Sequence, residues 1–287
     1  MVMDLNAERF HKIFEKLFGK ARKATPASMK SAEEYKKRLE ENPQLDSFYL
    51  ELKIGPPTQI PWSCNTEAFL GCRKLSYEGY IKRIHPDYHD LYFHFGVAAY
   101  RLSIKYKDLL QKQKVSYNLM VPLRHEDGHY LWFNQVAVPS GFDEEGHITH
   151  HINSYRLMYA FQEENPMSHS PLVTFKAKVD DKVKSELQQL SAESMLDLMF
   201  AQHLEEHPPL SENHRRILLA WCKVYTEEGP EHTHHKSVAQ ELGIKPASLK
   251  KYVQPILAAA REVFPLHPMR EMNDLGRLMV GLFGVGG

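Results

Sequence analysis

Two hydrophobic periods divide the chain. Between residues 45 and 158, apolar and polar residues alternate in short runs, which is the period of half-buried strands. The alternation predicts five strands and one long helix, in the order Ser47–Ile54, Thr58–Ser63, a helix after Pro86, 114–124, 129–140 and 147–158. Turn residues at Glu126–Gly128 and Asp143–Gly146 separate the last three strands. We therefore expect an α+β region built on an antiparallel sheet.

Further along the chain, the apolar spacing changes to three and four residues, the period of amphipathic helices. It predicts a connecting helix over 180–206 and three helices between residues 210 and 256. Gly243 lies where a tight turn needs a left-handed residue, and Pro246 suits the first turn of the next helix. Pro255 should end or kink that helix near Gln254, because proline removes a backbone hydrogen bond.

The N-terminal region is also predicted to be helical. An apolar stripe on the first helix, flanked by lysine and arginine, is made by Phe10, Ile13, Phe14, Leu17 and Phe18. We expect this stripe to pack on the sheet or across a dimer interface; binding to an anionic membrane surface is the alternative. A polar helix over Ser31–Glu41 then leads into the first strand.

These patterns predict a fold of the α+β class with an added all-α domain. The expected parts are an N-terminal helical flank 1–44, a sheet-containing domain 45–160, a linker with a possible added strand and the connecting helix 161–207, a helical domain 208–268, and a C-terminal tail 269–287 with a frayed end. At 287 residues, a chain of about two domains is the ordinary expectation.

Composition narrows the function. Lys+Arg and Asp+Glu balance at 36 each, so nucleic-acid binding would need a local basic patch. The three cysteines form no CxxC pair, which argues against a zinc ribbon or a disulfide framework. No early apolar run resembles a signal peptide, and no run of about 18 apolar residues appears. We expect a cytoplasmic protein that does not enter a membrane.

A local basic patch does exist on the last predicted helix. One side of that helix carries polar and basic residues with no acid among them: Lys245, Ser248, Lys250, Lys251 and Gln254. The opposite side carries Leu249, Val253 and Ile256. A helix of this kind suits the DNA major groove, with lysines on phosphates and Ser248 and Gln254 near base edges. The alternative is an ordinary helical hairpin with solvated lysines.

The run 210–256 resembles the LuxR-type helix-turn-helix. The likeness rests on the opening Leu210-Ser211, the Val238-Ala239-x-x-Leu242-Gly243-Ile244 helix, and Ser248-Leu249-Lys250 at the start of the recognition helix. The resemblance implies double-stranded DNA as a partner. The loop Thr226–His235 is longer than in that family, and Pro255 departs from it.

Residues 45–158 resemble a PAS domain. The fragments that carry the likeness stand in the right order: Pro61–Asn65 with Phe69–Gly71, Ile84-His85-Pro86-Asp87, Glu126–Trp132, and Asp143–Gly146. The resemblance implies a sensor or dimerisation module. Another small antiparallel sheet with one helical face is the alternative.

The cofactor remains unknown. A flavin-binding PAS domain would need its cysteine on a later helix than Cys72, which we interpret as structural. His89 and His94 lie where haem-binding PAS domains place a ligand, but we expect both to be exposed, and haem is not favoured. We expect no metal site; a loop with His232, His234 and His235 is interpreted as solvated.

His150 is the one candidate ligand-binding residue of this domain. Strand alternation places His150 with Ile148 and Ile152, so it should face the cavity if these isoleucines are core. The alternative is a hydrogen-bonded core histidine.

The combined interpretation is a sequence-specific transcription regulator: a PAS sensor, with a possible small-molecule ligand, controls a homodimer that binds DNA. The alternative is a PAS-containing signalling scaffold that binds proteins and not DNA. No Gly-rich phosphate loop, kinase signature or paired nucleophile and base indicates an enzyme. His85 and Asp87 are interpreted as capping residues of the following helix.

Overall fold

The computed structural model describes residues 22–55, 57–112, 115–161, 173–175, 179–184, 186–187, 212–229, 234–263 and 269–283. They belong to two compact units: one comprises 1–162 and 173–179, the other 163–172 and 180–287. The expected apolar stripe Phe10–Phe18 and most of the expected connecting helix lie outside the described residues.

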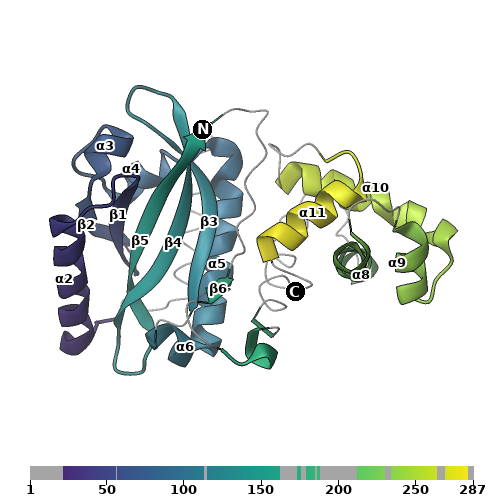
Figure 1. Cartoon of the computed structure of the whole chain (residues 1–287), viewed down its shortest axis with the longest axis horizontal. Coiled ribbons are helices and arrows are strands. Elements are labelled where there is room, and N and C mark those ends of the chain that lie inside the picture. The colour runs from purple at the N-terminus through teal and green to yellow at the C-terminus, as the bar shows by residue number, and fades with distance from the viewer. Residues whose placement is uncertain are drawn as a thin grey trace. The chain divides into compact units, whose positions relative to one another are not determined.

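The first unit is built on an antiparallel sheet (Figure 1). Its strands are β1 (Ser47–Lys53), β2 (Gln59–Cys64), β3 (Val115–Arg124), β4 (Tyr130–Phe142), β5 (Ile148–Ala160) and β6 (Val173–Phe175). Their order across the sheet is β2-β1-β5-β4-β3-β6. The five expected strands are confirmed within about two residues, and β6, paired to β3, is the added strand.

Helices flank this sheet. Their bounds are α2 (Pro26–Glu41), α3 (Thr66–Leu70), α4 (Tyr77–Ile81), the 3₁₀ turn η1 (Pro86–Tyr88), α5 (His89–Lys105) and α6 (Lys107–Gln111). The side chain of Thr25 caps α2 by accepting from the backbone N–H of Ser28, and Pro26 fills the first helical position. Capping by His85 is confirmed: its Nδ1 accepts from the backbone N–H of Asp87 at 3.3 Å.

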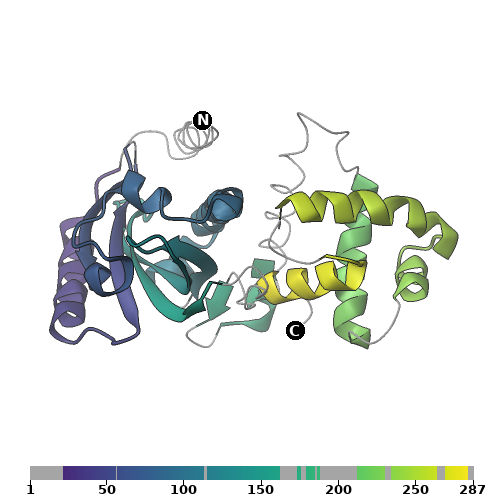
Figure 2. The ribbon, with the colours of Figure 1, turned by 90° about the horizontal axis from the view of Figure 1, so that it is seen from above.

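The two sheet faces have different coverings. Alternation along β1 places Leu50 and Leu52 on one face and Glu51 on the other. Leu52 lies beside α5 residues, whereas Glu51 forms an ion pair with Lys36 of α2. The helices α2 and α5 therefore cover opposite faces, as the turned view also indicates (Figure 2). On the α5 face, Phe48 stacks on Tyr155 with ring centroids 4.5 Å apart.

The second unit is helical in its described part. It contains α8 (Glu212–Glu228), α9 (His235–Glu241), α10 (Pro246–Val263) and α11 (Met272–Phe283). Its core includes Trp221, Val238, Leu249 and Leu275, each at most 2% exposed. Of the two expected effects of Pro255, an end of α10 near Gln254 is wrong, because the helix runs past Pro255 to Val263 and buries Ile256 and Leu257; a kink there stays a prediction.

The expected C-terminal tail over 269–287 is wrong for Met272–Phe283, which form the helix α11. Met272, Leu275, Leu278 and Met279 of α11 are buried, and this helix packs mainly on α8. Gly276 allows the close approach, since a Cβ there would lie 3.3 Å from the Tyr225 ring. No helix among the described residues is long and apolar enough to cross a membrane.

Candidate functional site

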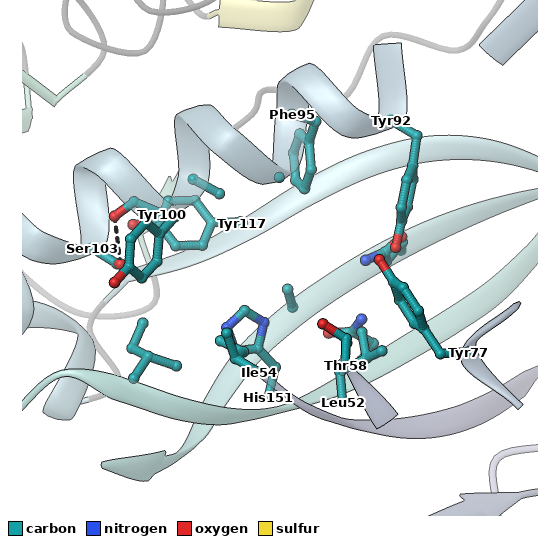
Figure 3. A pocket seen from close by; sticks show the side chains of 16 residues that line it. Leu52, Ile54, Thr58, Tyr77, Tyr92, Phe95, Tyr100, Ser103, Tyr117 and His151 are labelled. Carbon is teal, nitrogen blue, oxygen red and sulfur yellow. Dashed lines mark hydrogen bonds between the residues drawn. The ribbon is translucent and has the colours of Figure 1, made fainter. Parts of the chain in front are cut away.

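The first unit contains a partly open cavity of about 80 Å³ between its sheet and α5 (Figure 3). Leu52, Ile54 and Ile148 form part of the sheet wall, and Phe95 and Ala99 form part of the helix wall. Aliphatic and aromatic walls with a few polar groups are typical of sites for small molecules. None of the described lining residues carries a charge near pH 7.

Strand register decides which histidine faces this cavity. In the β1–β5 pair, Leu52 lies opposite His151 and Lys53 lies opposite His150. Opposed residues in an antiparallel pair share a face, so His151 projects with Leu52 into the cavity. The expectation that His150 lines the cavity is therefore wrong.

A β-bulge explains the error. In the β4–β5 pair, Gly141 lies opposite His150 and Phe142 opposite Ile148, which leaves Thr149 as the extra residue. The bulge reverses the alternation, so Ile148 and His151 both line the cavity although they are three residues apart. Simple alternation would have placed them on opposite faces.

His150 is instead a core residue on the α2 face. It is 7% exposed, and its Nδ1 lies 3.0 Å from Thr149 Oγ1. Burial lowers the pKa of His150, and the nearby Glu51 opposes this shift. Gly141 makes room for the ring, because a Cβ there would lie 2.7 Å from His150 Nδ1.

Among the residues that the structure describes, three polar atoms of the cavity find no hydrogen-bond partner: His151 Nε2, Asn153 Oδ1 and the Tyr117 hydroxyl. Leaving such a buried group unpaired costs about 1–3 kcal/mol, so water or a ligand is expected to satisfy them. Figure 3 shows Tyr117 and His151 reaching into the cavity from β3 and β5.

Protonation limits what the cavity accepts. Burial lowers the pKa of His151 to about 4, so its imidazole is neutral near pH 7, with one nitrogen as donor and one as acceptor. Burial also raises the pKa of Tyr117, Tyr77 and Tyr92 well above their usual range. The Asn153 oxygen requires a donor from its ligand. The cavity thus suits a small uncharged molecule with an N–H or O–H group.

Sequence reasoning missed Tyr117, His151 and Asn153 as cavity residues. Alternation along 147–158 groups His151 with Thr149, away from the isoleucines expected in the core. The available signal was Gly141, because a glycine within a strand pattern is a sign of a bulge.

The basic residues of α10 form the second candidate site. Lys245, Lys250, Lys251 and Gln254 are exposed and Ser248 is half-exposed, whereas Leu249 is fully buried. The turn before α10 has the expected form: Gly243 has a φ of 65°, and Ile244 N–H donates to Ala239 O at 2.9 Å. The structure thus presents all five residues to solvent, and their contact with DNA stays a prediction.

Two further histidines, His234 and His89, depart from expectation. His234 is fully buried rather than solvated; its Nδ1 lies 3.1 Å from Glu228 Oε2 and its ring contacts Trp221 edge-on. His89 is buried too, with Nε2 3.0 Å from the carbonyl of Ile84, and the side chain of His94 lies outside the described residues. Cys72 is half-buried, and burial raises its pKa, in keeping with a structural role.

The described residues therefore define a chain with an antiparallel-sheet unit that holds a neutral cavity and a helical unit that exposes a basic helix.

No family model and no curated protein matches the sequence. Solved structures give weak likenesses. The PAS/PAC sensor domain of a diguanylate cyclase from Marinobacter aquaeolei is 18% identical, with 38% of this chain and 92% of that chain covered and a TM-score of 0.28.

Two further structures cover different shares of the chain. A PAS domain from Colwellia psychrerythraea is 13% identical, covers 45% of this chain and 97% of its own, and has a TM-score of 0.30. VqmA of Vibrio cholerae, solved with ligand and DNA, is 12% identical, covers 86% and 88%, and has a TM-score of 0.24. All three TM-scores are below 0.5, so these likenesses are weak.

Proposed function

We propose that the chain is a sequence-specific DNA-binding transcription regulator, in which a PAS-type sensor controls a LuxR-like helix-turn-helix. The observation that carries the proposal is the first half of α10. It follows a tight turn at Gly243, is anchored by the buried Leu249, and exposes lysines in a stretch, 242–261, whose sequence contains no acid. A helix presented in this way can enter the major groove while α9 supports it.

The cavity supplies the sensing half of the proposal. A small uncharged ligand that satisfies His151, Asn153 and Tyr117 would stabilise one conformation of the sheet unit over others. Control then requires that the two conformations present α10 differently to DNA. We propose a homodimer as the binding form, because one short helix makes few base contacts.

DNA binding is tested without knowledge of the operator. Sites are selected from a random duplex library by the purified chain, and affinity is then measured by fluorescence anisotropy at several salt concentrations. The double variant Lys250→Ala/Lys251→Ala should weaken binding and lower the salt slope by about 0.9 for each phosphate that a lysine no longer neutralises. The control Lys74→Ala/Lys112→Ala removes the same charge from exposed positions of the sheet unit and should leave the slope unchanged.

Two outcomes would count against the proposal. If no duplex is enriched, the protein-binding scaffold becomes the better interpretation. If both double variants lower the salt slope equally, the effect comes from net charge and α10 does not read DNA.

A further inference from the structure

The hairpin between β3 and β4 brings two histidines and a carboxylate together at its tip. His125 Nδ1 lies 2.9 Å from Asp127 Oδ1, and His129 Nδ1 lies 2.5 Å from the same oxygen. The three atoms are all within 4.8 Å of one another. We propose that this His125–Asp127–His129 cluster binds one divalent transition metal of the nickel, copper and zinc group.

The backbone fixes the spacing of the cluster. His125 and His129 are joined across the turn by a hydrogen bond from His125 N–H to His129 O at 2.8 Å. Gly128 permits the turn with a φ of 105°. The two imidazole rings consequently stack with centroids 4.9 Å apart, and both present Nδ1 to Asp127.

The hairpin tip is also attached to the rest of the unit. Glu126 N–H donates to Leu70 O at 3.1 Å, and Arg83 donates to the carbonyls of Leu70 and Arg124. Gly71 lets the tip approach closely, since a Cβ there would lie 3.1 Å from His125 Nε2. The turn that carries the two histidines is therefore held in place by hydrogen bonds, which lowers the conformational entropy that metal binding would cost.

The hairpin between β4 and β5 carries a similar cluster of side chains, and an arginine lies within it. Asp143, Glu145 and His147 converge at the turn between β4 and β5, and Arg22 lies among them. The Arg22 guanidinium is 2.9 Å from Asp143 Oδ2 and 2.5 Å from His147 Nδ1. A cation thus already occupies the centre of that cluster.

At the β3–β4 hairpin, no lysine or arginine among the described residues forms an ion pair with Asp127. Two longer hydrogen bonds of 3.3 Å lie within the turn, from the backbone N–H of Asp127 to His125 Nδ1 and from the backbone N–H of His129 to Asp127 Oδ1. The short contacts between each Nδ1 and the carboxylate oxygen become attractive with a proton on Nδ1 or with a cation that both atoms share. Two imidazoles and one carboxylate match the preference of nickel, copper and zinc ions for nitrogen with some oxygen. Such metals lie about 2.0–2.2 Å from these ligands, so the three side chains would have to rotate until their ligand atoms surround one ion.

Binding is measured on the full chain after treatment with a chelator and desalting. Ni²⁺ is titrated calorimetrically, and the Cu²⁺ form is examined by electron paramagnetic resonance, which counts coordinating nitrogens. We expect one saturable ion per chain and two imidazole nitrogens on Cu²⁺. His129→Ala and Asp127→Asn should each weaken Ni²⁺ binding by at least about tenfold, since even outer-shell changes cost that much.

Matched controls locate the site. Glu126→Gln removes a carboxylate from the same turn and should change the affinity little, and His147→Ala removes a histidine of the Arg22-filled cluster and should do the same. Retained urea midpoints show that the variants fold. The proposal is overturned if no stoichiometric binding occurs, if His129→Ala and Asp127→Asn bind Ni²⁺ as well as the parent, or if His147→Ala is the variant that no longer binds it.

Discussion

A buried ion pair joins α2 to the sheet and allows a quantitative test of the packing. Lys36 Nζ lies 2.9 Å from Glu51 Oε2, and the two side chains are only 9% and 2% exposed. Lys36 has a second partner in the exposed Glu33 at 2.5 Å, whereas the buried Glu51 Oε1 has no hydrogen-bond partner in the described part of the chain. Burial alone would lower the pKa of Lys36, but its hydrogen bonds to both glutamates raise it.

This asymmetry predicts unequal effects of two substitutions. Lys36→Met leaves the Glu51 carboxylate buried without its ion-pair partner, and it should lower the free energy of unfolding by about 3–5 kcal/mol at pH 7. Glu51→Gln leaves Lys36 paired to Glu33 and should cost about 1–3 kcal/mol. The double variant Lys36→Met/Glu51→Leu should recover most of the stability, because an apolar pair can replace a buried ion pair.

The assay is urea unfolding followed by tryptophan fluorescence. Trp62 and Trp132 report on the sheet unit and Trp221 on the helical unit, so Trp221→Phe removes the signal of the second unit. Equal destabilisation by Lys36→Met and Glu51→Gln would refute the argument that only Glu51 lacks an alternative partner.

Three further predictions address the cavity and the helical unit. Burial lowers the pKa of His151 from 6.5 to about 4, so between these pH values the unfolded state binds a proton that the folded state does not bind. The free energy of unfolding should therefore fall by at most about 3 kcal/mol from pH 6.5 to pH 4. The variant His151→Gln should show a smaller fall, measured as urea midpoints. Gly243→Ala should cost about 1–2 kcal/mol through backbone strain alone, since a Cβ there meets no atom, and Gly243→Asn should cost less in the same assay. Leu275→Ala should lower stability by about 2–5 kcal/mol in the Trp221 transition, and no change would mean that α11 contributes little packing.

The sheet could be predicted from sequence because its information is local. Alternation marked the five strands, and turn residues such as Glu126–Gly128 and Asp143–Gly146 marked the hairpins. The turn before α10 was equally local, since Gly243 adopts the left-handed conformation that its position required. The exposed basic side of α10 followed from the helical period, because Leu249 had to be buried.

Features that depend on packing between distant segments were not predicted. His234 is buried by Trp221 and by a partner, Glu228, which the loop composition did not reveal. Helix α11 is held by its packing on α8, so its glycine-containing sequence alone wrongly indicated a tail. In α10, Ile256 and Leu257 are buried beyond Pro255, and this burial offsets the missing backbone hydrogen bond.

The cavity shows why one residue can change an assigned function. Within a regular strand, alternation correctly predicts the sheet face of each side chain. A single inserted residue reverses the predicted face of every residue after it. Here Thr149 is that residue, so His151 takes the position in the cavity that the pattern gave to His150. Gly141 on the partner strand was the sequence sign, because only a residue without a Cβ fits opposite the His150 ring. A glycine inside an alternating strand should therefore be taken as a possible bulge before any side chain beyond it is assigned to a site.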